Sequence, residues 1–180
     1  SRTMRAAQKL YEKGAITYMR TDSTSLSETA LPEIIAAVTK EFGEKYLTVR
    51  HYKTKSKNAQ EAHEAIRPTD PAKKTAGFTD DEKRLYTLIR TRTLASQMSD
   101  AEILRTKIIA NTTDRTLPNF SLNGSRLLFD GWLKLDSAAR GDDVEVPAVV
   151  ASDPLHLEEI TSEEKQTEPP HRYTEAGLVK

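Results

Sequence analysis

The feature that most constrains the fold is a change of hydrophobic periodicity near residue 100. Before this point, apolar residues recur at three- and four-residue spacing, which is typical of amphipathic helices. After it, short β-branched and aromatic runs alternate with turn residues, which is typical of strands. The sequence therefore predicts an α+β chain in which a helical part, residues 1–100, precedes a strand-rich part, residues 101–173. Residues 174–180 are expected to start a further helix, with Thr174 as its N-cap.

Two predicted helices flank a short extended segment at the start of the chain. Residues 2–13 carry apolar residues at helical spacing, and Gly14 ends that helix as a C-cap glycine does. Residues 15–20 are β-branched and aromatic, so they favour an extended segment. A loop rich in Ser and Thr follows, in which Ser25 and Glu28 fit a capping box that starts the second helix.

Two more helices are predicted before residue 100. Residues 59–66 suit a short helix that Pro68 stops. Thr79 and Glu82 form another capping box, from which a long helix extends to about residue 98. Its expected buried stripe consists of Leu85, Leu88, Ile89, Leu94 and Met98.

The strand-rich part contains two longer predicted strands, residues 103–110 and 120–135. Asn123 and Gly124 lie within the second of these and predict a hairpin turn there. Shorter β-like pieces are residues 144–150 and 155–157.

Charge is unevenly distributed, although the formal net charge is zero. Residues 45–74 hold eight Lys or Arg against three acids, whereas residues 130–168 hold eleven acids against three bases. A basic segment of this kind allows a polyanionic partner, although an ordinary solvated surface is the more common explanation. With no cysteine, the chain can form no disulfide framework and no thiolate metal site. No apolar run approaches the roughly 20 residues of a membrane helix.

Tyr18 and Arg20 are the first residues that suggest chemistry. Residues two apart in an extended segment face the same side, so these side chains would lie together. A tyrosine hydroxyl has a reference pKa of about 10 and is a weak nucleophile at neutral pH. A guanidinium nearby favours the phenolate and also binds phosphate. The pair suits phosphoryl transfer through a covalent phosphotyrosine; a half-buried aromatic beside a solvated arginine is the commoner arrangement of such residues.

His63 is the second candidate, because it lies among basic residues on the short helix predicted over residues 59–66. An imidazole there could donate to a phosphate oxygen or carry a proton. A plain helix-surface histidine is the commoner alternative. Glu61 and Glu64 flank it without the spacing of zinc ligands, so no metal site is predicted.

Two motifs carry a resemblance to a known family. Residues 8–23, which include Ile-Thr-Tyr-Met-Arg-Thr-Asp, resemble the active-site signature of the type IA DNA topoisomerases. Residues 59–69, Ala-Gln-Glu-Ala-His-Glu-Ala-Ile-Arg-Pro-Thr, are similar to the family's second motif, and this order and separation are specific. Met19 favours the bacterial topoisomerase I branch, because topoisomerase III and reverse gyrase usually carry Pro there. Residues 169–180 resemble the segment that leads into the next domain, so an internal fragment is expected.

The resemblance implies a set of site residues and a domain arrangement. Tyr18 would be the nucleophile, with Arg20 and His63 at the same active site. Residues 1–100 would be a helical, winged-helix-like tyrosine domain, and residues 101–173 the returning half of a β-barrel-like arch. The residues expected to contact DNA are Asp22, Ser23, Lys53, Lys55, Lys57, Gln60, Arg67 and Thr69.

The implied activity is ATP-independent relaxation of negative supercoils through transient cleavage of one strand and a 5′-phosphotyrosyl intermediate. The family's Mg²⁺ is held by acidic residues of a separate Toprim domain, and no such Asp-x-Asp cluster occurs in this sequence. The isolated chain is therefore expected to be inactive. The implied partners are single-stranded or negatively supercoiled DNA and the rest of the same polypeptide, in the cytoplasm at the nucleoid, with no membrane.

Two alternatives come from other functional classes. One is a non-catalytic winged-helix DNA-binding module that uses Lys53, Lys55, Lys57 and Arg67 but has no need of Tyr18. The other is a structural or partner-binding fragment without a nucleic-acid role. Binding of single-stranded oligonucleotide at moderate salt separates the structural fragment from the other two, and formation of a covalent adduct separates the topoisomerase from the DNA-binding module.

Overall fold

A computed structural model describes residues 1–52, 63–114, 116–140, 142 and 144–178 of the 180-residue chain. The chain forms two compact units, Ser1–Val146 and Pro147–Lys180. The domain limits expected from the sequence, at residues 100 and 173, stay predictions.

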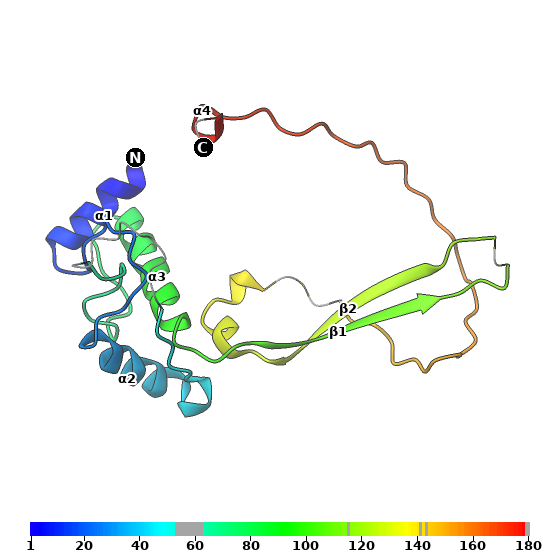
Figure 1. The fold of residues 1–180 in the computed structure, drawn as a ribbon, viewed down its shortest axis with the longest axis horizontal. Coiled ribbons are helices and arrows are strands. Elements are labelled where there is room, and N and C mark those ends of the chain that lie inside the picture. The colour runs from blue at the N-terminus through cyan, green and yellow to red at the C-terminus, as the bar shows by residue number, and fades with distance from the viewer. Residues whose placement is uncertain (53–62, 115, 141, 143, 179–180) are drawn as a thin grey trace. The chain divides into compact units, whose positions relative to one another are not determined.

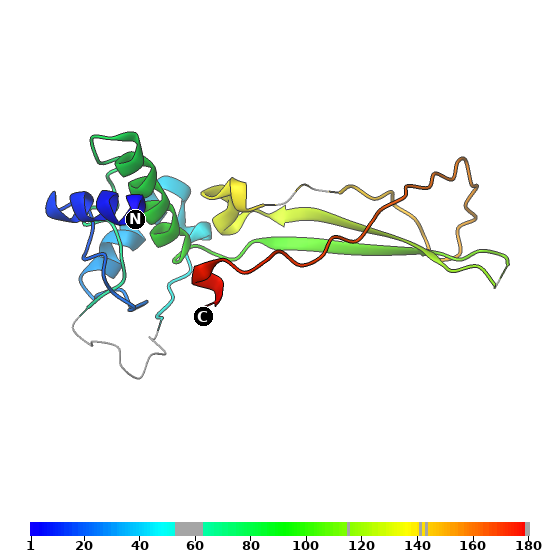
Figure 2. The ribbon, with the colours of Figure 1, turned by 90° about the horizontal axis from the view of Figure 1, so that it is seen from above.

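Three helices build the start of the first unit: α1 (Arg2–Glu12), α2 (Ala30–Phe42) and α3 (Asp80–Ala95) (Figures 1 and 2). Gly14 ends α1 as predicted, because it adopts a φ of +65° and its N–H donates to the Tyr11 carbonyl at 2.8 Å. The N-cap contact of the predicted capping box at α3 is confirmed as well, since the Thr79 hydroxyl accepts from the Glu82 N–H at 3.3 Å. The Glu82 carboxylate reaches one residue further back than the box requires and accepts from the N–H of Phe78 at 2.9 Å.

The start of α2 differs from the prediction. Its N-cap is Thr29, and the N–H of Ala30 donates to the hydroxyl of Ser27 at 3.3 Å. The capping box expected at Ser25 and Glu28 is therefore wrong, because the turn that satisfies the first helical N–H lies two residues later. Ser25 instead donates its hydroxyl to the carbonyl of Tyr52 at 2.9 Å.

The buried face of α3 is more polar than its apolar spacing predicts. Leu88 is 56% exposed, whereas Tyr86 and Arg90 are buried, so the expected stripe is wrong at that leucine. Arg90 is tolerated there because its Nε donates to the carbonyl of Pro71 at 2.9 Å and its guanidinium pairs with Glu41.

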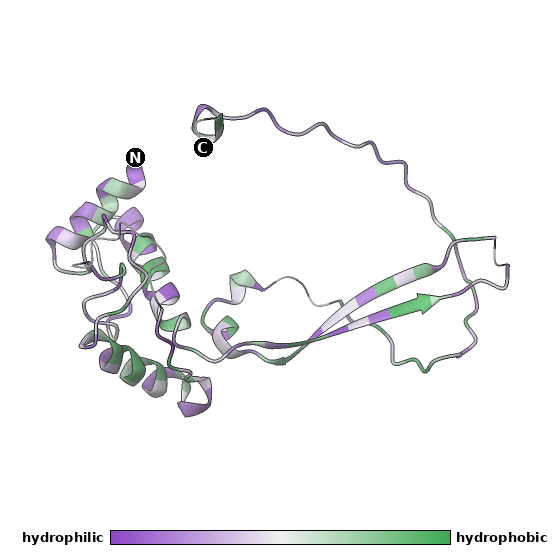
Figure 3. Ribbon diagram, in the orientation of Figure 1, coloured by the Kyte–Doolittle hydropathy of each residue, from purple (hydrophilic) through white to green (hydrophobic). Residues whose placement is uncertain are grey.

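Two small hydrophobic cores hold these helices. One is formed by the apolar face of α2, which Figure 3 shows as a hydrophobic stretch, together with Tyr46, Leu94 and Met98. Tyr46 ends the 3-10 helix η1 (Glu44–Tyr46). The other core joins α1 to α3, and its members are Ala7, Leu10, Ile16, Ala76 and Tyr86. Through Ile16, this second core fixes the segment that carries Tyr18.

The strand-rich part is an antiparallel pair, β1 (Glu102–Ala110) and β2 (Phe120–Phe129). The hairpin turn predicted at Asn123 and Gly124 is wrong, because both residues lie inside β2 and pair with Lys107 and Thr106. Gly124 instead permits a close approach, since a Cβ there would lie 2.4 Å from a methyl carbon of Val146.

The chain leaves β2 earlier than predicted. The 3-10 helices η2 (Gly131–Lys134) and η3 (Ser137–Ala139) replace the end of the strand expected over residues 120–135. The described parts of 144–150 and 155–157 are not strands either, although the N–H of Ser125 donates to the carbonyl of Val144 at 3.0 Å. Among the described residues the sheet has two strands and is not closed, so the fold is mixed helix and strand without a confirmed barrel-like arch.

The second unit contains one helix among its described residues, α4 (Glu175–Leu178). The predicted N-cap is confirmed, because the Thr174 hydroxyl accepts from the N–H of Gly177 at 3.2 Å. In the part of the chain that the structure describes, no helix has the length and apolar character needed to span a membrane.

Candidate active site

Two segments about fifty residues apart pair directly after α1. The N–H of Thr17 donates to the carbonyl of Arg67 at 2.9 Å, and the N–H of Thr69 donates to the carbonyl of Ala15 at 3.1 Å. These bonds flank an antiparallel bridge between Ile16 and Pro68, both of which are buried. The extended segment predicted over residues 15–20 is thus a single short bridge, and it brings the two sequence motifs together.

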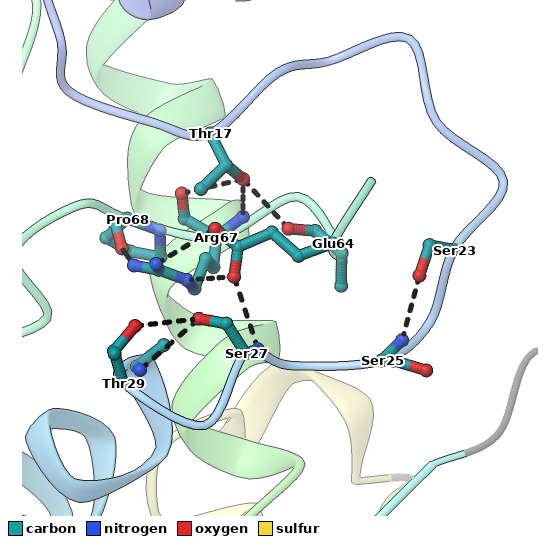
Figure 4. Close-up of polar contacts among 10 residues, drawn as sticks. Thr17, Ser23, Ser25, Ser27, Thr29, Glu64, Arg67 and Pro68 are labelled. Atoms are coloured by element: carbon teal, nitrogen blue, oxygen red, sulfur yellow. Dashed lines mark hydrogen bonds and ion pairs between the residues drawn. The ribbon is translucent and has the colours of Figure 1, made fainter. Parts of the chain in front are cut away.

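The side chain of Thr17 strengthens this pairing. Its hydroxyl donates to the carbonyl of Ala65 at 2.8 Å and accepts from the N–H of Arg67 at 2.9 Å (Figure 4). The residue that precedes Tyr18 is therefore bound to the second motif by both its backbone and its side chain.

Tyr18 and His63 lie together, as the convergence of the two motifs predicted. Their ring centroids are 5.5 Å apart and their planes are inclined by 31°. Both side chains are half-buried, and the ring of Tyr11 approaches Tyr18 edge-on at 5.2 Å. Arg20 follows two residues after Tyr18 and is exposed. The arrangement thus brings a tyrosine hydroxyl and an imidazole together, with an exposed arginine two residues along the chain.

Glu64 and Arg67 form a two-point ion pair within the second motif. Nε and Nη2 of Arg67 donate to the two oxygens of Glu64 at 2.9 and 3.0 Å, and Nη1 donates to the carbonyl of Pro68 at 2.9 Å. The N–H of Ser27 also donates to Glu64, at 3.3 Å. Burial raises the pKa of the Glu64 carboxyl, but the hydrogen bonds from Arg67 and Ser27 outweigh burial and leave the pKa below its ordinary value.

The loop between Tyr18 and α2 is tied to the same motif. The N–H of Ala65 donates to the carbonyl of Ser25 at 2.8 Å, and the hydroxyl of Ser23 accepts from the N–H of Ser25 at 3.2 Å. Sequence reasoning missed Thr17, Ser27 and Glu64 as site-building residues. Opposite charges three residues apart, at Glu64 and Arg67, were the one available signal for the ion pair, although the segment that holds them is not helical.

The predicted DNA contacts fall in different places. Asp22 is exposed and Ser23 is half-buried in the loop, whereas the hydroxyl of Thr69 donates to the carbonyl of Gly14 at 2.5 Å. Arg67 is only 11% exposed. The other four predicted contacts lie outside the described residues: Lys53, Lys55, Lys57 and Gln60. The predicted helix over 59–66 is wrong at residues 63–66, which are not helical, and its earlier residues lie outside the described ranges.

A pocket of about 760 Å³ opens beside these segments. Met19, Ser23 and Ala65 line it from the two motifs, and Ile89 and Trp132 line it from α3 and η2. Its lining is mainly apolar, but Arg50, Arg92 and Asp100 also line it, so the pocket places two guanidinium groups in the space next to the site. Across the described ranges, no three His, Cys, Asp or Glu side chains gather as a metal site requires. The described side chains therefore do not by themselves supply the ligand set that a bound Mg²⁺ would need.

Comparisons with known proteins agree on one family. A family model described as DNA topoisomerase matches residues 1–180. The DNA topoisomerase 1 of Streptomyces coelicolor is 48% identical over 193 residues, which cover 99% of this chain and 20% of that protein. The DNA topoisomerase 1 of Helicobacter pylori (strain ATCC 700392 / 26695) is 41% identical over 194 residues, which cover 100% of this chain and 26% of that protein.

A solved structure is similar as well. Full-length topoisomerase I from Thermotoga maritima, in a monoclinic crystal form, matches with a TM-score of 0.65 and 35% sequence identity. The match covers 81% of this chain and 25% of that one. The chain thus spans about a fifth to a quarter of the length of the relatives it matches.

Proposed function

Because the chain belongs to the bacterial DNA topoisomerase I family, of type IA, we propose that it supplies the strand-cleaving tyrosine of a full-length isomerase. The observation that carries this proposal is the contact between the rings of Tyr18 and His63, with centroids 5.5 Å apart. Residues 45 positions apart in sequence meet here because the backbone of Thr17 pairs with that of Arg67. An incidental surface tyrosine would need no such arrangement.

The proposed reaction is a pair of transesterifications on single-stranded DNA. The hydroxyl oxygen of Tyr18 attacks a backbone phosphorus and gives up its proton. The bond from phosphorus to the 3′-oxygen breaks, and that oxygen takes a proton to become a 3′-hydroxyl. The 5′-phosphate stays on Tyr18 while the other strand passes through the gap. Attack by the 3′-hydroxyl then restores the DNA and frees Tyr18, so the phosphodiester energy is conserved and no ATP is consumed.

Arg20 and His63 would assist this attack in different ways. The planar guanidinium of Arg20 suits two-point binding of a phosphate, and its charge favours the phenolate form of Tyr18. His63 would donate a hydrogen bond to the developing charge or carry a proton. Since His63 does not form the new bond, its replacement should slow cleavage less than the loss of the Tyr18 hydroxyl.

The DNA strand would run past the loop and the basic segment that follow these residues. The proposed contacts are Asp22, Ser23, Lys53, Lys55, Lys57, Gln60 and Thr69. Arg67, whose three guanidinium nitrogens donate to protein oxygens, is better suited to hold the site together. We place the Mg²⁺ ligands in other parts of a longer polypeptide, together with the remaining surfaces needed to relax negative supercoils in the cytoplasm.

The test is covalent capture of end-labelled oligonucleotide by a full-length enzyme that carries this sequence. With the label at the 3′ end, radioactivity should become attached to the protein, because the downstream fragment holds the 5′-phosphotyrosyl bond. With the label at the 5′ end, a free shortened strand with a 3′-hydroxyl should appear. Tyr18→Phe should abolish both products while preserving the fold. Protein-linked label from the 5′-labelled strand, or an adduct formed by Tyr18→Phe, would refute the proposal.

A further inference from the structure

We propose that Glu64 is a positioning residue for DNA cleavage, whose carboxylate acts through Arg67 to hold Tyr18 and His63 in one arrangement. The inference rests on the proposed function, because it concerns the rate at which Tyr18 cleaves DNA. Glu64 would act without touching the DNA.

Arg67 contacts the sequence neighbours of both reactive residues, Thr17 beside Tyr18 and Glu64 beside His63. Its carbonyl accepts from the N–H of Thr17, and its own N–H donates to the hydroxyl of Thr17. Thr17 is covalently joined to Tyr18. On the other side, the Arg67 guanidinium reaches Glu64, which is joined to His63. Besides the direct ring contact, a hydrogen-bonded route therefore joins the tyrosine to the histidine through Thr17, Arg67 and Glu64, which Figure 4 shows.

The geometry of the ion pair makes it suitable for positioning. Two parallel N–H···O bonds, at 2.9 and 3.0 Å, fix the plane of the guanidinium relative to the carboxylate. A third bond, from Nη1 to the carbonyl of Pro68, fixes the guanidinium relative to the bridge between Pro68 and Ile16. The Arg67 side chain is 11% exposed and that of Glu64 26%, so the pair is better protected from solvent than an ordinary surface ion pair.

Glu64 also reaches the loop that follows the reactive tyrosine. Its Oε2 accepts from the N–H of Ser27, and the next residue, Ala65, donates its N–H to the carbonyl of Ser25. One carboxylate thus joins three segments: the segment with Tyr18, through Arg67, the segment with His63, and the loop before α2. Glutamine could not replace it, because an amide has one acceptor oxygen and its NH₂ group would face the guanidinium donors.

The experiment compares Glu64→Gln with Glu41→Gln in the full-length enzyme. Glu41 pairs with Arg90, a pair of similar burial that joins α2 to α3, so its loss should lower stability by a comparable route. Three quantities are measured: the melting temperature, the Kd for single-stranded oligonucleotide, and the single-turnover rate of adduct formation at saturating oligonucleotide.

We expect Glu64→Gln to slow single-turnover cleavage by about tenfold or more, because small displacements of reacting groups are costly. Its Kd should change by less than about threefold, since the reactive side chains are moved and not removed. Glu41→Gln should cleave within about twofold of the wild-type rate even where its melting temperature falls. Arg67→Lys keeps the charge but loses the planar fork of the guanidinium. It should show the same cleavage defect as Glu64→Gln, with a smaller loss of stability than that variant. Combining Glu64→Gln with Arg67→Lys should add little, because both remove the same contact.

Three results would overturn the inference. One is wild-type single-turnover cleavage by Glu64→Gln. Another is an equal cleavage defect in Glu41→Gln, which would assign the effect to general destabilisation. The third is a defect of Glu64→Gln confined to Kd, which would make the ion pair part of DNA binding. Failure of the proposed function itself would look different, because the wild-type enzyme would then form no adduct or Tyr18→Phe would form one.

Discussion

The pairing of the two motifs can be tested by Thr17→Val, which keeps the β-branched shape and removes only the hydroxyl. That hydroxyl donates to the carbonyl of Ala65 at 2.8 Å and accepts from the N–H of Arg67 at 2.9 Å. The backbone bond from the Thr17 N–H to the Arg67 carbonyl is left in place. The variant therefore isolates the contribution of the side chain.

The expected loss of stability follows from those two hydrogen bonds. Each such bond contributes about 1 kcal/mol net to the free energy of unfolding. Thr17, Ala65 and Arg67 are half-buried, so water can reach the abandoned partners in part and the full penalty of an unpaired buried group does not apply. We expect a loss of about 2 kcal/mol. For a chain of this size, that corresponds to a fall in Tm of about 4–8 °C.

Urea denaturation of the purified chain, followed by circular dichroism, measures this loss. The matched control is Thr87→Val on α3, where the exposed hydroxyl donates at 2.9 Å to the carbonyl of Lys83, one turn earlier in the same helix. That carbonyl remains accessible to water, so the control should change the unfolding free energy by no more than about 0.5 kcal/mol. Equal stabilities for the two variants would refute the reasoning that the Thr17 hydroxyl ties the motifs together.

Three further predictions concern charge and activity. Hydrogen bonds from the N–H of Phe78 and from Lys13 lower the pKa of Glu82 from its ordinary 4.5 to about 2. The charged carboxylate therefore stabilises the fold fully above about pH 4.5, and this stabilisation is lost as the pH falls towards 2. The difference in unfolding free energy between wild type and Glu82→Gln, measured by urea denaturation, should become smaller as the pH falls from 4.5 towards 2. A difference that does not change with pH would contradict this role of Glu82. Binding of single-stranded DNA by the chain should be weak and fall steeply with salt, and fluorescence anisotropy should show it further weakened when Ala replaces Lys53, Lys55 and Lys57. The chain alone, with Mg²⁺, should leave supercoiled plasmid unrelaxed on an agarose gel, and relaxed product would disprove this.

Capping rules predicted the helix ends correctly where a single residue sets the backbone conformation or satisfies a terminal N–H. Gly14 adopts a positive φ that L side chains rarely reach, and Thr79 satisfies a free N–H at the start of α3. The same rules failed for the buried face of α3, because Arg90 is buried through partners far away in sequence. An analysis of hydrophobic periodicity considers only apolar residues, so it cannot predict a buried arginine whose hydrogen-bond acceptors come from other parts of the fold.

The mistaken hairpin has a similar cause. Asn-Gly is the strongest short signal for a two-residue turn, but glycine also serves wherever another chain segment comes close. Gly124 is buried against Val146, a neighbour 22 residues away that no local window contains. The turn therefore lies elsewhere, between Ala110 and Phe120, and the two strands extend past the predicted site.

The contact between Tyr18 and His63 could be expected from the family resemblance but not from any local sequence pattern. Pro68 explains how the sequence selects this contact. Sequence reasoning used this proline only to stop a helix. In the structure it lies opposite Ile16, at a position whose flanking residues make the ladder hydrogen bonds. A shift by one residue would move proline into a hydrogen-bonding position, where its missing N–H would leave a carbonyl unpaired. The proline thus favours one register, and that register places Arg67 beside Thr17 and so brings the histidine of one motif to the tyrosine of the other.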